Sequence, residues 1–256
     1  MDKEKTIIVA LAGNPNTGKS TIFNKLTGAR QHIGNYPGVT VEKKEGVFEH
    51  NNYEVRIVDL PGTYDLTSDT LDELVTRKFL IDEKPDIVVD VLDSSNLERN
   101  LYLGVQLSEL GIPLILDLNM IDVLESRGRK IDVEKLSKLM SCPAITTIGT
   151  KGKGIAELKD AIVALADNET VYSTVQVDYG IDSNNVIEAV QKPLSEIPEV
   201  SDKYELRWLS VKLLEDDKEL KESVSAYAGT DISVFSHIAK LRKHIEITSF
   251  WSFCFN

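Results

Sequence analysis

Gly13-Asn-Pro-Asn-Thr-Gly-Lys-Ser20 follows the apolar run Ile7–Ala12 and precedes a helical pattern. The spacing G-x-x-x-x-G-K-S between a strand and a helix is that of a phosphate-binding loop. Its glycines let backbone N–H groups surround a polyphosphate, its lysine reaches the β- and γ-phosphates, and its serine can ligate Mg²⁺. The helix N-terminus that follows also favours negative charge. The pattern predicts a nucleoside triphosphate site that comprises Gly13, Asn14, Pro15, Asn16, Thr17, Gly18, Lys19, Ser20 and Thr21.

Strand-like and helix-like segments alternate around this loop and through the first two thirds of the chain. Predicted strands are Thr6–Leu11, Val47–Glu49, Tyr53–Asp59, Asp86–Leu92, Pro113–Asn119 and Ala144–Ile148. Predicted helices are Lys19–Leu26, Thr70–Ile81, Glu98–Leu110, Val133–Met140 and Ile155–Ala166. Asn51-Asn52 indicates a hairpin that adds one antiparallel edge. We therefore expect an α/β fold, a doubly wound and mostly parallel sheet with ligand loops at the carboxyl ends of its strands.

The pattern changes after Asp167. Residues 168–178 resemble an extended linker, and apolar faces at helical spacing then recur in Ser183–Gln191, Ser201–Leu214, Asp217–Tyr227 and Ile232–Ile245. We expect two domains: residues 1–167 with the sheet, and residues 168–256 as a small all-helical domain.

Composition limits the function classes. The 256 residues carry a net charge of −12 and show no basic stripe, which argues against a nucleic-acid partner. Cys142 and Cys254 suggest no disulfide framework, and the charged Met1–Lys5 leaves no room for a signal peptide. No apolar run approaches the roughly 20 residues that span a bilayer. We expect this chain by itself to be soluble.

A second nucleotide motif, Asp59-Leu-Pro-Gly62, ends a predicted strand. In isolation D-x-x-G is most often a β-turn. Downstream of a phosphate loop, its Asp can hold a Mg²⁺-bound water, and the Gly N–H can sense a γ-phosphate. We therefore expect Asp59 and Gly62 at the nucleotide.

Asn119-Met-Ile-Asp122 follows another apolar strand. A carboxylate at Asp122 can accept hydrogen bonds from N1–H and the N2 amino group of guanine, whereas adenine offers no matching pair of donors. The alternative is an Asx cap, with Asp122 at a helix start. Among the other motifs, guanine recognition is the better interpretation, so the sheet is expected to have a P-loop GTPase fold.

Two weaker elements complete the site. Thr40, between the first helix and the hairpin, has a hydroxyl that could complete the Mg²⁺ shell when γ-phosphate is present. Ile148 and Gly149 lie at the carboxyl end of the last predicted strand, where a backbone N–H, that of Gly149, could meet guanine O6.

The segments GNPNTGKSTIFNKLTG, NYPGVTVEKKEG, DLPGTYDL, LERNLYL and NMID together resemble the cytosolic G-protein domain of prokaryotic ferrous iron transport protein B. The resemblance covers about residues 5–165, and the helical remainder more loosely resembles that family's helical domain. One departure is Ile148-Gly149, where the family usually has Ser-Ala.

The resemblance implies a GTPase tethered to a transmembrane Fe²⁺ permease region of the same protein, at the cytoplasmic face of the membrane. It implies GTP and GDP as ligands, with Ser20 and Thr40 as Mg²⁺ ligands, Asp59 acting through a water, and Asn119, Met120 and Asp122 at the guanine. It also implies that Asn16 helps to hold a K⁺ ion that accelerates hydrolysis. A homo-oligomer is a further expectation.

The residues themselves indicate slow hydrolysis. Ras-type GTPases orient the attacking water with a Gln after D-x-x-G, whereas Thr63 and Tyr64 follow Gly62 here. A K⁺ ion held by Asn16 and by backbone carbonyls of the 31–40 loop could supply the missing positive charge. We expect catalytic contributions from Lys19, Asn16, Thr40 and Gly62.

Two alternatives remain open. One is a nucleotide-sensing switch with negligible turnover, and the other is a soluble GTPase that acts on RNA or ribosomes, for which the acidic tail offers no basic appendage. His32, His50, His237 and His244 do not cluster in the sequence, so we assign no iron site.

Overall fold

The computed structural model describes residues 5–28, 30–67, 69–167, 177–227, 235–236 and 238–242. The chain divides into two compact units, Met1–Val175 and Gln176–Asn256. The predicted boundary after residue 167 borders a stretch, 168–176, that lies outside the described residues. The position of the boundary therefore stays a prediction.

In the described part of the first unit, seven strands form one sheet in the order β2-β3-β4-β1-β5-β6-β7. Their bounds are β1 Lys5–Ala12, β2 Gln31–Asn35, β3 Glu42–His50, β4 Tyr53–Asp59, β5 Ile87–Asp93, β6 Leu114–Asn119 and β7 Ala144–Thr146. Strands β4, β1, β5, β6 and β7 are parallel neighbours, whereas β2 and β3 are antiparallel. The expected mostly parallel α/β sheet is confirmed.

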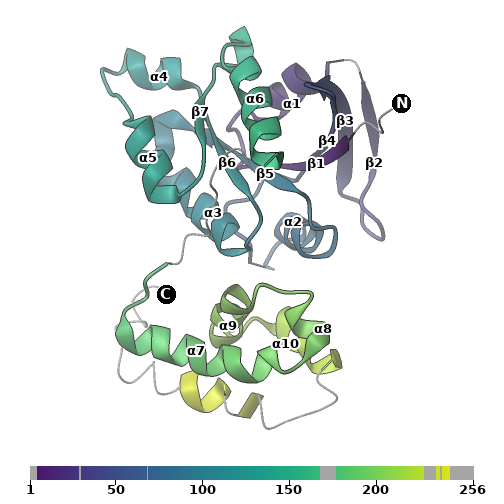
Figure 1. The fold of residues 1–256 in the computed structure, drawn as a ribbon, viewed down its shortest axis with the longest axis vertical. Coiled ribbons are helices and arrows are strands. Elements are labelled where there is room, and N and C mark those ends of the chain that lie inside the picture. Colours follow the sequence, from purple (N-terminus) through teal and green to yellow (C-terminus); the bar gives the residue numbers. More distant parts are fainter. Residues whose placement is uncertain are drawn as a thin grey trace. The chain divides into compact units, whose positions relative to one another are not determined.

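Helices cover both faces of the sheet (Figure 1). Their bounds are α1 Lys19–Thr27, α2 Leu71–Asp82, α3 Leu97–Glu109, α4 Ile121–Ser126, α5 Val133–Met140 and α6 Ile155–Ala166. Helices α1 and α6 pack on one face, and α2, α3 and α5 pack on the other. Double coverage explains why β6 is buried along its whole length and reads as a nearly continuous apolar run.

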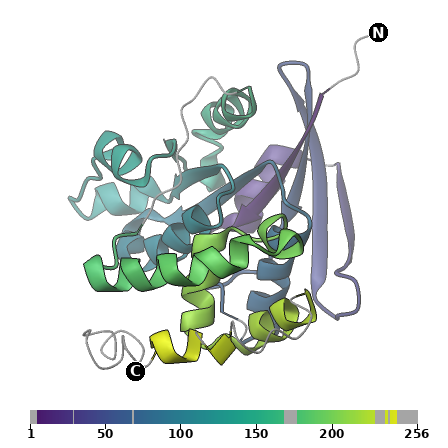
Figure 2. The ribbon, with the colours of Figure 1, turned by 60° about the horizontal axis from the view of Figure 1, so that its bottom comes forward.

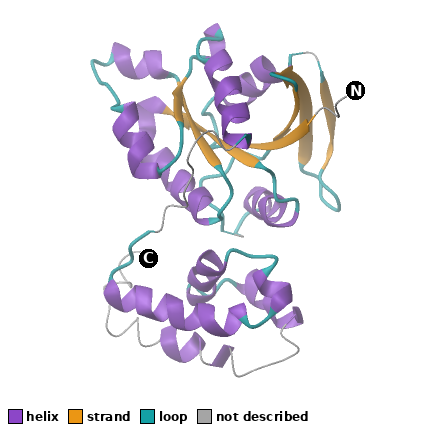
Figure 3. Cartoon of the chain, in the orientation of Figure 1, coloured by secondary structure: helices purple, strands orange, loops and turns teal. Residues whose placement is uncertain are grey.

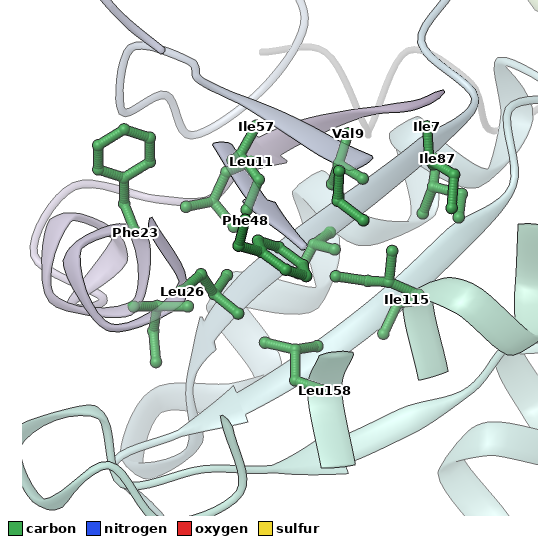
Figure 4. Packing of buried hydrophobic residues seen from close by; sticks show 14 of the residues in the cluster. Ile7, Val9, Leu11, Phe23, Leu26, Phe48, Ile57, Ile87, Ile115 and Leu158 are labelled. Carbon is green, nitrogen blue, oxygen red and sulfur yellow. The ribbon is translucent and has the colours of Figure 1, made fainter. Parts of the chain in front are cut away.

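Alternating residues of each strand face the two helical layers. Val9 and Leu11 of β1 join Phe23 of α1 and Leu158 of α6 in the cluster that Figure 4 shows. Ala10 of the same strand joins the opposite cluster with residues of α2 and α3. The two cores fix both faces of the central strands, and with them the loops at the strand ends.

The antiparallel edge differs from the prediction. Asn51 and Asn52 have φ of 47° and 63°, as a tight hairpin turn requires, and they join β3 to β4. A further strand, β2, pairs antiparallel with β3, so the segment 31–35 is an edge strand rather than loop (Figure 2). It was missed because Gln31–Asn35 is mostly exposed and has no apolar alternation.

Each regular element described in the second unit is a helix (Figure 3). These are α7 Ile181–Ser195, α8 Pro198–Ser201, α9 Leu206–Leu214 and α10 Lys218–Tyr227. They bury Trp208 with the leucines and valines of α7 and α9. The predicted single helix Ser201–Leu214 is wrong, because α8 ends at Ser201 and α9 begins at Leu206. The predicted helix Ile232–Ile245 lies largely outside the described residues.

Candidate nucleotide-binding site

Four sequence motifs lie at the carboxyl ends of parallel strands. The phosphate loop follows β1, Asp59 ends β4, Asn119 ends β6, and Gly149 follows β7. Because these strands run parallel in one sheet, their carboxyl ends share one edge. The topology therefore brings together motifs that are separated by up to about 130 residues in the sequence.

The phosphate loop needs its glycines for steric reasons. Gly13 has a φ of 149°, and a Cβ there would lie 2.5 Å from the carbonyl oxygen of Val91. Gly18 caps α1 with a φ of 86°, and a Cβ there would lie 2.5 Å from Nδ2 of Asn119. Asn16 is exposed and also left-handed, with a φ of 68°. Left-handed residues among right-handed ones, as at Asn16 and Gly18, let the backbone N–H groups of a loop turn toward an anion.

A charged pair joins the phosphate loop to D-x-x-G. Lys19 Nζ donates to the Asp59 carboxylate and, at 2.5 Å, to the carbonyl of Leu60. Both side chains are largely buried, with exposed fractions of 11% for Lys19 and 7% for Asp59. A Cβ at Gly62 would lie 3.3 Å from Cα of Pro15, so the two loops pack backbone to backbone. The two motifs therefore lie together, and the expected contact of Asp59 and Gly62 with a nucleotide stays a prediction.

A polyphosphate and Mg²⁺ fit the residue types at this edge. Asn14 is 3% exposed, and among the described residues neither its Oδ1 nor its Nδ2 has a partner, which leaves a buried amide free for a ligand. The hydroxyls of Ser20 and Thr40 are on exposed residues, and Asp59 is a carboxylate. Oxygen atoms of this kind are the ligands that Mg²⁺ takes beside substrate phosphates.

The segment between β2 and β3, which contains Thr40, is anchored by Tyr36, a residue that was not predicted from the sequence. Tyr36 is 6% exposed, and its hydroxyl donates to the carbonyl of Asp59 at 3.3 Å. Its ring packs edge-on against Phe79 of α2, with 6.2 Å between the centroids. Burial and the nearby Asp59 carboxylate raise the pKa of Tyr36 well above its usual range. Its aromatic position after β2 could have indicated this anchor.

Asn119 connects the phosphate loop to the loop after β7. Its Nδ2 donates to the carbonyl of Thr17 at 2.8 Å, and its Oδ1 accepts from the N–H of Gly149 at 3.0 Å. The Gly149 N–H therefore has a partner within the protein, and a role for it at guanine O6 stays a prediction. Ile148 is buried, and its N–H donates to the carbonyl of Lys153. The predicted base contact of Ile148 likewise remains open.

Asp122 lies at the start of α4. The N-cap of that helix is Met120, with a φ of 58° and no side-chain cap, so the Asx-cap alternative does not describe Asp122. Lys151 Nζ donates to Asp122 Oδ2 at 2.9 Å, and this bond lowers the pKa of the carboxyl. Asp122 is therefore an ionised acceptor, as guanine recognition requires. Lys151 was not predicted as a site residue because it lies in a 3₁₀ turn, η2 Gly149–Lys151. The periodicity of apolar residues does not predict a turn of this kind.

A pocket of about 640 Å³ lies elsewhere, on the antiparallel edge. Arg30, Lys43, Arg56, Phe79 and Glu83 are among its lining residues, and none of the predicted nucleotide residues lines it. The candidate site is thus a set of loops at a sheet edge rather than this hollow.

In the part of the chain that the structure describes, no helix is both long enough and apolar enough to cross a bilayer. Within the same residues no three His, Cys, Asp or Glu side chains gather in a group that could hold a metal ion.

Comparison with known proteins gives the family of the chain. Residues 7–162 match the family model of ferrous iron transport protein B, and residues 179–249 match that of the FeoB cytosolic helical domain. The Fe(2+) transporter FeoB of Shigella flexneri is 42% identical over 248 residues, which are 94% of this chain and 31% of that protein. A fusion of Fe(2+) transport protein A with FeoB from Porphyromonas gingivalis is 42% identical over 220 residues, 85% of this chain and 26% of that protein. The chain thus spans about a third or less of these relatives.

Solved structures agree over both units. A GDP-bound mutant of S. thermophilus NFeoB matches with a TM-score of 0.83 and 34% identity, covering 96% of this chain and 90% of that one. The GMPPNP form of the cytosolic domain of the T. maritima FeoB iron transporter gives a TM-score of 0.78 and 35% identity, covering 94% and 96%.

Proposed function

The chain belongs to the family of ferrous iron transport protein B, and from that premise we propose that it is the GTP-binding and GTP-hydrolysing part of a membrane transporter for Fe²⁺. Its nucleotide state would regulate uptake through a permease region of the longer protein, at the cytoplasmic face of the membrane. The observation that carries the proposal is the convergence of Lys19, Asp59, Asn119 and Asp122 at one sheet edge.

Base selection would rest on Asp122. Its ionised carboxylate can accept from the two guanine donors at once, whereas adenine would leave it unpaired. Lys151 holds the carboxylate from the side, and Asn119 ties the base loop to the phosphate loop. This arrangement supports GTP and GDP over ATP.

The phosphate end would use backbone N–H groups of the loop, the buried amide of Asn14 and the ammonium of Lys19. Lys19 already has two acceptors, Asp59 and the Leu60 carbonyl, so a polyphosphate would compete with them for its protons. Ser20, Thr40 and Asp59, the last through a water, would hold Mg²⁺, and Asn16 would hold K⁺. When bound, these cations neutralise charge on the phosphates. Gly62 would offer its N–H to the γ-phosphate.

One contact supports the expected slow turnover. Thr63 is 3% exposed, and its hydroxyl donates to the carbonyl of Asp65 at 2.7 Å, so it faces inward instead of orienting a water. This observation also favours the alternative of a nucleotide-sensing switch with negligible turnover.

The rate of GTP hydrolysis, measured in KCl and in NaCl at equal ionic strength, distinguishes a GTPase from a nucleotide-sensing switch with negligible turnover. We expect K⁺ to accelerate the wild type and Asn16→Ala to lose most of that acceleration, on the order of 10²-fold for one electrostatic group. Equal rates in the two salts would remove the K⁺ role. Absence of single-turnover hydrolysis in either salt would favour the switch module.

The remaining expected partners are proposals as well. The acidic balance, with a net charge of −12, continues to favour a chain that does not bind nucleic acid over an RNA- or ribosome-associated GTPase. A homo-oligomer of the chain stays a prediction.

A further inference from the structure

A buried carboxylate lies under the guanine half of the site. Asp117 precedes Asn119 by two residues on β6, so both side chains project from the same face of the sheet. Asp117 is fully buried beside Val91, its register partner on β5. Its Oδ1 accepts from the hydroxyl of Thr147 at 2.6 Å, and its Oδ2 has no partner among the described residues. The ionised form of a carboxyl is costly in this setting, because burial without a full set of hydrogen bonds favours the neutral acid.

Thr147 lies between two acceptors. Its Oγ1 is 2.6 Å from Asp117 Oδ1 and 3.3 Å from Asn119 Oδ1, and the residue is fully buried. A hydroxyl has one proton, so it cannot donate to both oxygens at once. An ionised Asp117 takes that proton, because charge-assisted hydrogen bonds are the shorter and stronger ones. A protonated Asp117 can itself donate to Thr147, which leaves the threonine proton for Asn119.

Asn119 links the hydrogen bond of Thr147 to the nucleotide loops. The same Oδ1 that faces Thr147 accepts from Gly149 N–H, and the Nδ2 of the amide holds the Thr17 carbonyl. A second donor to Oδ1 would fix the amide plane more firmly. The position of the phosphate loop relative to the base loop depends on that plane.

We infer that Asp117 is a positioning residue for guanine-nucleotide binding, which acts through Thr147 on Asn119. The inference rests on the proposed function, since it concerns the affinity of that same site. When Asp117 is protonated, it donates a hydrogen bond to Thr147, and Thr147 donates one to Asn119. When Asp117 is ionised, Thr147 donates to Asp117 instead, and the hydrogen bond to Asn119 is lost. The proton is exchanged with solvent, and no covalent bond changes.

The surroundings place the change in an accessible pH range. Burial raises the pKa of Asp117 to about 7, although the hydrogen bond from Thr147 opposes the shift. The ionisable group that senses its charge is Asp90 of β5, which projects from the opposite face, in register with Leu116. On the Asp117 face, α1 and α6 contribute apolar side chains such as Ile22 and Leu158 to the core.

The test is the affinity for a fluorescent GDP analogue, titrated from pH 6 to pH 8.5 on the full chain. We expect wild-type affinity to fall about three- to tenfold as the pH rises through about 7, the ratio that one ordinary hydrogen bond provides. Thr147→Val should bind that much more weakly at low pH and lose the pH step, whereas Thr147→Ser should keep it. Asp117→Asn stays neutral. At every pH it should therefore bind the analogue as tightly as the wild type binds it at low pH.

Asp90→Asn is the matched control, because it neutralises the other buried carboxylate without contact to the nucleotide loops. Its profile also records the titration of the GDP phosphates, against which the other profiles are compared. Profiles of Thr147→Val and Asp117→Asn that superimpose on the control would overturn the inference while the site still binds GDP. A wild type that binds no analogue at any pH would instead overturn the proposed function. If thermal unfolding shows that Asp117→Asn does not fold, the two Thr147 variants decide.

Discussion

The candidate site has a phosphate half and a guanine half, and different interactions stabilise the two. The phosphate half depends on glycine backbone geometry at Gly13 and Gly18 and on the buried ion pair of Lys19 with Asp59. The guanine half depends on a chain of neutral hydrogen bonds around Asn119, with one exposed ion pair of Asp122 and Lys151 at its rim. The first half is specified almost completely by contiguous motifs. The second half recruits residues outside its motif, because side-chain hydrogen bonds can come from any neighbouring strand.

The largest effect should come from the phosphate half. Lys19→Ala removes the cation that would face the β- and γ-phosphates and leaves the Asp59 carboxylate buried without it. We expect the single-turnover rate of GTP hydrolysis to fall by about 10²–10³, as for the loss of one preorganised electrostatic group. Lys25→Ala, an exposed lysine on the same helix, is the matched control and should hydrolyse GTP at the wild-type rate. A Lys19→Ala rate within a few-fold of that control would remove the lysine from the mechanism.

An intermediate effect is expected at the base. Asp122→Asn should weaken GTP binding and strengthen xanthosine triphosphate binding, because xanthine presents an acceptor where guanine presents its N2 donor. Loss of one charge-assisted pair should cost on the order of 1.5–3 kcal/mol, or about ten- to a hundredfold in affinity. Titration with fluorescent analogues measures it, and Glu125→Gln on the exposed side of the same helix is the control. Unchanged GTP binding by Asp122→Asn would place the base elsewhere.

The smallest effect on nucleotide binding is expected at Asp90, whose role is in stability alone. Burial raises the pKa of this carboxyl from 3.8 to about 8, and both of its oxygens lack partners among the described residues. Between these pH values the unfolded chain releases a proton that the folded chain keeps. Folding stability therefore falls as the pH rises, by up to about 1.4 kcal/mol per pH unit, and levels off above about 8.

Asp90→Asn removes this titration. The gain in free energy of unfolding over wild type should grow from pH 5 to pH 8 and then stay constant, as denaturant titrations would measure. Asp117 titrates in both proteins, so its contribution cancels in the difference except for its Coulomb repulsion with Asp90. A gain that does not change with pH would mean that Asp90 is ionised in the folded protein.

Much of this could be predicted from the sequence. Strands and helices followed from apolar periodicity, and the phosphate loop and D-x-x-G followed from fixed spacing, because backbone geometry is a local property. Strand β2 was not predicted because an exposed edge strand has no apolar face that would indicate it. The break between α8 and α9 was not predicted because the apolar residues that both helices bury have a spacing compatible with one continuous helix.

The guanine half was predicted less completely. Asn119 and Asp122 were expected as base contacts, but the structure adds a bridge from Asn119 to Thr17 and Gly149. Thr147 and Lys151 come from the strand end and turn after β7, about 30 residues downstream, and only the sheet order brings them near. Asp117 lies within the predicted strand Pro113–Asn119 and was not expected as part of the site. Long-range pairing of this kind has no signal in a single sequence.

The central claim is that motifs on four strands form one guanine-nucleotide site. Competition for the bound fluorescent GDP analogue tests it most directly, with unlabelled GDP and ADP as matched competitors at equal Mg²⁺. We expect GDP to displace the analogue at least a hundredfold more effectively than ADP, since adenine leaves the Asp122 carboxylate unpaired, and a site with an unpaired polar group discriminates strongly. Displacement by ADP at the same concentrations as GDP would contradict it.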